Sequence, residues 1–173
     1  MTIIMGAISG DETILTSDSL ASEDYYQSEY GPKVFTLSGW VIGVSNSFTA
    51  LQILQSSLAL AEECPMPAAE HELEDISILS LGLLRPLITD VIGTEEIEIL
   101  IGGGGKLWHI QADWAVFPLP YAAIGSGSSY ALGSYYSQAG TTPAKDRLLE
   151  ASKAAEFFCP SVKGPFHTVV AGK

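Results

Sequence analysis

The second residue of the chain is the first candidate for chemistry. Thr2 directly follows Met1, so removal of Met1 would leave one residue with both a hydroxyl and a free α-amino group. A threonine hydroxyl paired with an N-terminal amine is an established nucleophile that carries its own base. The amine ordinarily has a pKa of about 7.7 to 8.0, and a nearby ammonium would lower it further. Thr2 is therefore a candidate nucleophile after loss of Met1.

Lys33 is the cation best placed in the sequence to act on such a threonine. It is the only lysine or arginine before position 85, where it is outnumbered by twelve carboxylates. Pro32 precedes it and Val34 and Phe35 follow it, so we expect it at the mouth of a strand with an apolar flank. A solvated lysine at a strand end is the alternative interpretation, and threonine is common in second position without any catalytic role.

Length and charge exclude several classes of function. The 173 residues suit one domain, residues 1–173, and are too few for two. Eight basic against twenty acidic residues give a net charge of −12, which repels nucleic acid and anionic membranes. No apolar run approaches the roughly 18 to 20 residues of a membrane span, and the N-terminus has no signal-peptide pattern. A cytoplasmic protein is the expectation.

Metal and cofactor signals are weak. Cys64 and Cys159 lie 95 positions apart and form neither a disulfide framework nor a metal pattern. The acidic stretch around His71 lacks a second histidine at ligand spacing, which favours a solvated helix face. Gly102 to Gly105 lack the Lys-Ser/Thr of a phosphate loop and are typical of a hairpin turn. We expect no cofactor and no metal.

The order of elements indicates how these residues are positioned. Alternation and turn residues predict strands, in two opening hairpins and a later group, at 2–8, 13–17, 34–37, 40–44, 97–101, 106–111, 115–124 and 166–171. Helical spacing predicts helices from the N-cap Ser47 to Cys64 and at 69–90, 128–139 and 144–158. Residues 19–32 read as a polar, tyrosine-rich stretch. Grouped strands and paired helices favour antiparallel sheets sandwiched by helices.

Thr2, Asp18 and Lys33, followed by IGSGSSYALG at 124–133, resemble the proteasome β-subunit family, including the bacterial HslV peptidases. The similarity spans nearly the whole chain. Four phrases occur in the family's order, and a fifth is closest to HslV: a small residue four positions after the threonine (Gly6), Thr16-Ser17-Asp18-Ser19, Lys33-Val34-Phe35-Thr36-Leu37, Gly125-Ser126-Gly127, and Phe166-His167-Thr168.

The resemblance implies roles for particular residues. Thr2 would attack a peptide carbonyl, Lys33 would tune proton traffic at Thr2, and Asp18 would hold and charge-balance Lys33. Ser126 would assist near the amine. Backbone N–H groups at Asn46 and Ser47 would form the oxyanion hole. Both residues also have a purely structural interpretation. Asp18 could be a turn residue, and Ser126 could simply suit a tight glycine turn.

Two phrases depart from the family pattern. The family usually has a Gly-Gly pair where this chain has Ser45-Asn46-Ser47. Asparagine or serine there can narrow the cleft or demand a strained backbone. Proteasome-type members also carry an aspartate three positions before a serine near the last helix, where this chain has Phe157-Phe158-Cys159-Pro160-Ser161.

Together, the resemblance implies an α+β, four-layer αββα sandwich of the N-terminal nucleophile hydrolase type. It implies a threonine-type endopeptidase that self-associates into rings, acts on peptides or unfolded proteins and works with an ATP-dependent unfoldase. Two alternatives stay open. One is a non-catalytic subunit of a proteasome-like shell, and the other is an amidase acting on a small molecule.

Overall fold

The computed structural model describes residues 2–23, 26–59, 73–93, 96–140 and 142–172. Its strands are β1 Ile4–Ser9, β2 Glu12–Ser17, β3 Leu20–Glu23, β4 Tyr26–Glu29, β5 Val34–Leu37, β6 Trp40–Ser45, β7 Glu98–Gly103, β8 Lys106–Ile110, β9 Val116–Pro118, β10 Tyr121–Ile124 and β11 His167–Ala171. Its helices are α1 Phe48–Ala59, α2 Leu73–Leu79, the π-helical turn η1 Ser80–Leu84, α3 Arg85–Ile92, α4 Ser128–Ser137 and α5 Ala144–Phe158.

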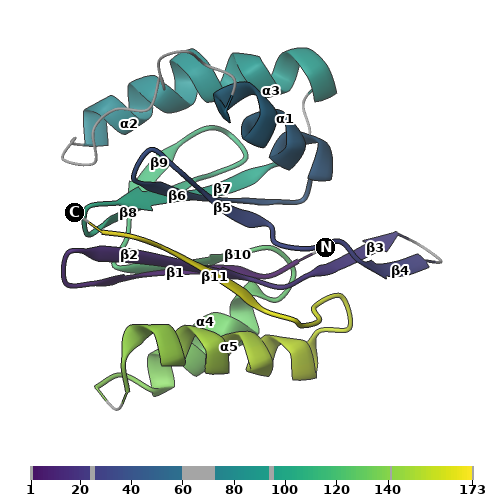
Figure 1. Ribbon diagram of the computed structural model, residues 1–173, viewed down its shortest axis with the longest axis vertical. Helices are drawn as coiled ribbons and strands as arrows, with labels where there is room; N and C mark the ends of the chain where they lie inside the picture. The colour runs from purple at the N-terminus through teal and green to yellow at the C-terminus, as the bar shows by residue number, and fades with distance from the viewer. Residues whose placement is uncertain (1, 24–25, 60–72, 94–95, 141, 173) are drawn as a thin grey trace.

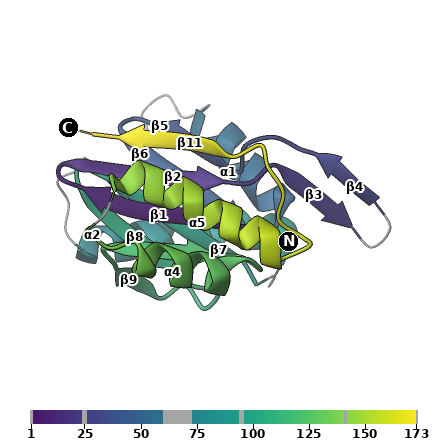
Figure 2. The ribbon, with the colours of Figure 1, turned by 90° about the horizontal axis from the view of Figure 1, so that it is seen from below.

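Four layers are stacked face to face (Figure 1). Helices α1, α2 and α3 cover one side of a sheet with strand order β5-β6-β7-β8-β9. A second sheet, β10-β1-β2-β11, lies against the other side, and α4 and α5 cover its outer face, where Figure 2 shows them side by side. Every strand pairing within these sheets is antiparallel. The expected αββα sandwich is confirmed.

The layers are held together by apolar side chains that point alternately to the two faces of each strand. In β1, Met5 packs toward α4 and α5, whereas its neighbour Ile4 packs between the two sheets. In β7, Ile99 and Ile101 pack toward α1 and α3, whereas Leu100 faces the inter-sheet core. Successive side chains of a strand point to opposite faces, so strands buried on both faces are apolar throughout.

Three elements differ from the sequence-based expectation. Within the stretch 19–32, expected as polar and without a strand, residues 20–23 and 26–29 pair as β3 and β4, which project from the edge of the sandwich (Figure 1). The single strand expected at 115–124 is two strands, and they belong to different sheets. Of the helix expected at 69–90, the residues from 73 onward form α2, η1 and α3, and the earlier ones lie outside the described residues. Within the described residues, no helix is both long and apolar enough to span a membrane.

Candidate active site

The β1–β2 hairpin brings Thr2 and Asp18 together. Ile4 pairs with Ser17, so Thr2 and Asp18 meet at the open end of the hairpin. The Asp18 backbone N–H donates to the Ile3 carbonyl at 3.2 Å, and the Ile3 N–H donates to Asp18 Oδ1 at 3.1 Å. The Thr2 hydroxyl donates to the same Oδ1 atom. The carboxylate is thereby fixed against the threonine by the strand pairing itself.

Lys33 completes this cluster from the segment that leads into β5. Its Nζ lies 2.6 Å from Thr2 Oγ1, 2.8 Å from Asp18 Oδ1 and 2.7 Å from the Leu20 carbonyl oxygen. The Lys33 backbone N–H donates to Ser17 Oγ at 3.0 Å, which anchors the lysine to the end of β2. Thr2, Asp18 and Lys33 are each at most 2% exposed. The structure thus joins three of the expected site residues in one buried hydrogen-bonded group.

Burial sets the electrostatics of the lysine. Loss of hydration lowers the pKa of Lys33 below its ordinary value, because burial disfavours the charged amine, while the attraction and hydrogen bond of Asp18 oppose that change. A lysine with a lowered pKa is more readily neutral near physiological pH. A neutral amine 2.6 Å from a hydroxyl oxygen can accept its proton.

A glycine turn holds the backbone of Thr2 from the other side. Ser126 Oγ and the Gly127 N–H each donate to the Thr2 carbonyl oxygen at 3.3 Å. Gly125 adopts φ +88°, and a Cβ on it would lie 2.5 Å from the Thr2 carbonyl oxygen and 2.8 Å from Thr2 Cγ2. Only glycine fits both the conformation and the space. The side chain of Ser126, the fourth expected catalytic residue, therefore contacts the backbone carbonyl of Thr2.

Two site residues were missed by sequence reasoning. Ser161 Oγ lies 2.8 Å from Ser126 Oγ, and Cys159 Sγ lies 3.2 Å from Ser161 Oγ. Burial raises the pKa of the Cys159 thiol, but its hydrogen bonds with Ser161 and Ser126 outweigh the effect of burial, so this pKa is lowered. The sequence pattern that could have indicated Cys159 and Ser161 is the phrase at 157–161. Its serine matches the serine of the proteasome-type pattern, but Phe158 stands where that pattern has an aspartate three positions earlier.

The expected oxyanion residues lie at the β6–α1 junction. Ser47 Oγ accepts the Ala50 N–H at 3.2 Å and so caps α1, as expected. Asn46 adopts φ +70°, and its side-chain amide donates to the Glu96 carbonyl at 3.0 Å. Asparagine tolerates this left-handed conformation better than most residues. The ring of Phe48, the first residue of α1, lies 5.7 Å from Lys33 Nζ, which places the junction beside the cluster.

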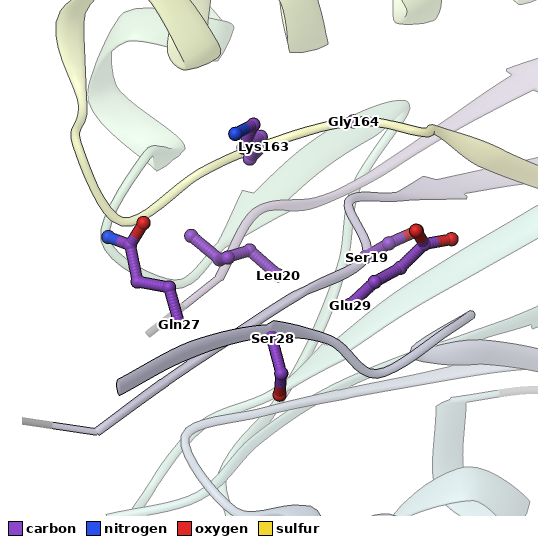
Figure 3. Close-up of a pocket in the computed structure, with 7 residues that line it drawn as sticks. All are labelled: Ser19, Leu20, Gln27, Ser28, Glu29, Lys163 and Gly164. Carbon is purple, nitrogen blue, oxygen red and sulfur yellow. The ribbon is translucent and has the colours of Figure 1, made fainter. Parts of the chain in front are cut away.

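The outer edge of the cluster borders a pocket. Asp18 Oδ2 accepts the backbone N–H groups of Leu20 at 3.3 Å and of Lys163 at 3.5 Å. These contacts bring the segment after α5 against the start of the β3–β4 hairpin. Between them lies a pocket of about 260 Å³, drawn in Figure 3 and lined by Ser19, Leu20, Gln27, Ser28, Glu29, Lys163 and Gly164.

Within the described part of the chain, no group of three or more His, Cys, Asp or Glu side chains is arranged to hold a metal. The acidic stretch around His71 lies outside the described side chains.

Solved structures match this fold over nearly its whole length. BPH of Thiobacillus denitrificans, solved in complex with epoxomicin, is 20% identical with a TM-score of 0.85, and the match covers 99% of this chain and 98% of that one. HslV of Trypanosoma brucei is 15% identical with a TM-score of 0.71 over 99% and 100% of the two chains. Anbu, an ancestral beta-subunit, of Yersinia bercovieri is 19% identical with a TM-score of 0.78 over 99% and 82%. No family model and no curated protein matches the sequence.

Proposed function

We propose that this chain, whose fold is that of the proteasome-like N-terminal nucleophile hydrolases, is a threonine-type peptidase with Thr2 as its nucleophile. The observation that carries the proposal is the contact of Thr2 Oγ1 with both Lys33 and Asp18 in a buried cluster. Burial costs Lys33 the hydration that a solvated lysine keeps, and the buried carboxylate of Asp18 offsets that cost while holding the amine against the Thr2 hydroxyl.

Removal of Met1, which lies outside the described residues, would free the Thr2 amine. Lys33 or that amine would accept the hydroxyl proton as Oγ1 attacks a peptide carbonyl, with Asp18 holding the lysine in place. The backbone N–H groups of Asn46 and Ser47 would stabilise the oxyanion. Collapse of the tetrahedral intermediate breaks the C–N bond and passes the proton to the leaving amine. Water then hydrolyses the acyl ester and restores the hydroxyl.

Peptides or unfolded proteins are the proposed substrates. The pocket is lined by Leu20 and Lys163, whose backbone N–H groups bond Asp18, and it would give a bound chain room near the cluster. The structural neighbour BPH is solved in complex with epoxomicin, which supports a ligand site in this fold. Self-association into rings in the cytoplasm, with an ATP-dependent unfoldase supplying unfolded chains, completes the proposal and is supported by the likeness to HslV and Anbu.

Intact-mass analysis followed by labelling with a peptide epoxyketone tests the nucleophile. We expect a mass lacking Met1 and one adduct on Thr2, because an epoxyketone has two electrophilic carbons and Thr2 would offer two nucleophilic atoms. A Thr2→Ala variant is the control and should stay unlabelled. Retained Met1 with no adduct would instead support a non-catalytic shell subunit. Hydrolysis of small amides but not of peptides would support an amidase.

The pH dependence of labelling tests the role of Lys33. Since burial lowers the pKa of Lys33, its neutral form appears below the ordinary lysine pKa of 10.5. The labelling rate should therefore rise with pH and level off before pH 10.5. In Lys33→Arg the guanidinium stays protonated, so the only remaining rise should come from the α-amine, whose ordinary pKa of about 7.7 to 8.0 a neighbouring cation lowers. Identical profiles for the two proteins would exclude proton transfer to Lys33.

A further inference from the structure

We infer that Cys159 is a positioning residue for Thr2, and that its thiol proton directs a chain of two serine hydroxyls onto the Thr2 carbonyl oxygen. The inference rests on the proposed function and adds to it a group that touches neither substrate nor the nucleophilic oxygen. Cys159 is the C-cap residue of α5, and it is 8% exposed. It lies in the same buried cluster as Ile3, the residue that follows Thr2.

Hydroxyl groups link the Cys159 thiol to the backbone of Thr2. Cys159 Sγ lies 3.2 Å from Ser161 Oγ, and Ser161 Oγ lies 2.8 Å from Ser126 Oγ. Ser126 Oγ donates to the Thr2 carbonyl oxygen at 3.3 Å. A longer contact of 3.7 Å joins the thiol directly to Ser126 Oγ. The end of α5 is thereby connected to the glycine turn that holds Thr2.

The backbone around Cys159 turns its side chain toward this group. The Cys159 N–H donates to the Ala155 carbonyl at 2.8 Å, and the Cys159 carbonyl accepts the Val162 N–H at 3.0 Å. The turn from 159 to 162 brings Ser161 back beside the thiol. The preceding residue, Phe158, is 59% exposed and stacks on Tyr130 with ring centroids 5.5 Å apart, so it lies at the surface, outside the group.

The number of protons fixes the direction of the hydrogen bonds. A serine hydroxyl and a neutral thiol each have one proton to donate. Ser126 uses its proton on the Thr2 carbonyl, so the 2.8 Å contact needs the proton of Ser161. The 3.2 Å contact then needs the proton of Cys159. Every proton therefore points toward Thr2, and the thiol is the first donor of the series.

Without the thiol proton, this direction is no longer fixed. Ser161 would accept the Ser126 proton as readily as it donates its own, because nothing at position 159 would occupy its acceptor site. Each time Ser126 donated to Ser161, the Thr2 carbonyl would keep only the Gly127 N–H, at 3.3 Å. The Cys159 proton thus keeps the Ser126 hydroxyl on the backbone of the proposed nucleophile.

Cys159→Ala and Cys159→Ser test the role of the proton, because serine retains one and alanine has none. Loss of one neutral hydrogen bond corresponds to about 2-fold to 10-fold, so we expect epoxyketone labelling of Cys159→Ala to be slower by that factor. Cys159→Ser should label faster than Cys159→Ala. Ser152→Ala is the matched control: it removes a buried hydroxyl of α5 that donates to the Leu148 carbonyl at 2.9 Å, and it should label as the wild type does.

The infrared S–H stretching band reports the position of the proton without any activity. In a Cys64→Ala background, Cys159 is the only thiol of the chain. A thiol is a weak donor, and donation lowers its stretching frequency. At the pH of the labelling reaction we expect a lowered band that rises when Ser161→Ala removes the nearest acceptor. An absent band, or a band that Ser161→Ala does not shift, would overturn the inference.

The two measurements separate a failure of the positioning role from a failure of the peptidase. Equal labelling of Cys159→Ala and the wild type, or equal slowing of Cys159→Ala and Cys159→Ser, would overturn the positioning role and leave the peptidase standing. If the wild type is not labelled at all, the peptidase fails, and the infrared band still decides the direction of the chain. Ser161→Ala should also label slowly, and it replaces Cys159→Ala if thermal unfolding shows that the latter does not fold.

Discussion

Replacing Lys33 by methionine is expected to slow acylation of Thr2 by about 100-fold to 10,000-fold, the range for loss of a positioned proton acceptor. Methionine fills a similar volume but cannot bond Thr2 Oγ1 or Asp18. The Asp18 carboxylate would be left buried at 0% exposure without its cation. Breaking a buried ion pair from one side costs about 3 to 5 kcal/mol, so the free energy of unfolding should fall by that amount.

Labelling rate and urea unfolding measure the two effects of Lys33→Met. Lys153→Met is the matched control, because Lys153 also pairs with a carboxylate, at 2.7 Å, but is 52% exposed. An exposed pair contributes about 0 to 1 kcal/mol, so this control should label normally and unfold almost as the wild type does. Equal behaviour of the two variants would mean that the Lys33 cluster serves neither chemistry nor stability.

Gly125→Ala is expected to have the second largest effect. The new methyl group would lie 2.5 Å from the Thr2 carbonyl oxygen and 2.8 Å from Thr2 Cγ2, at a backbone φ of +88°. The contact with the carbonyl oxygen cannot be relieved by a side-chain rotation, because that atom is backbone. Rotation of Thr2 about χ1 would relieve the contact with Cγ2 only by moving Oγ1 away from Lys33 and Asp18. The turn or Thr2 must therefore move. We expect about 100-fold slower labelling and a loss of stability that includes the roughly 1 to 3 kcal/mol of a strained left-handed residue.

Gly140→Ala isolates the steric part of this effect. Gly140 has a φ of +78°, close to that of Gly125, but a Cβ on it would meet nothing within 4 Å. Gly140→Ala should lose only the stability that a left-handed backbone costs an alanine, because the new methyl group meets no other atom. It should keep the labelling rate of the wild type. Crystal structures or circular dichroism of both variants would show whether the fold is retained. A labelling rate in Gly125→Ala equal to that of Gly140→Ala would contradict the packing of Gly125 on Thr2.

The parts of the fold that follow local rules could be predicted from the sequence. The opening hairpin with its Ser-Gly-Asp-Glu turn, the Ser47 cap and the two last helices all appear where turn chemistry, capping and helical spacing indicate. That hairpin also accounts for much of the site. Once β1 and β2 pair, Thr2 and Asp18 must lie at the same end.

The parts that were missed depend on contacts between distant segments. In the run at 115–124, β9 ends at Pro118 and β10 begins after Pro120, because proline cannot donate within a sheet, and between them the chain crosses from one sheet to the other. The β3–β4 hairpin is short and polar, so alternation gives it no hydrophobic signal. Ser161 reaches Ser126 across 35 positions, and no periodicity within one segment predicts such a contact.

The irregular helical segment has a local cause. The π-helical turn η1 immediately precedes Arg85, and Pro86 stands at the start of α3. Proline lacks the N–H that a continuous helix would need at that point, and it is tolerated in the first turn of a helix. A rearranged turn before it lets the helical segment resume as α3. The sequence, acidic at the start of this segment and apolar later, predicts one helix because it does not show the rearranged turn.

The pairing of β11 with β2 has a consequence for the order of events during synthesis. Ser161 and Lys163, which contact Ser126 and Asp18, belong to the segment leading into β11. A chain still emerging from the ribosome would present its threonine long before these late residues were available to support it. The Ser126 hydroxyl and the Asp18 carboxylate would therefore gain these contacts only after the segment at 161–163 has been made.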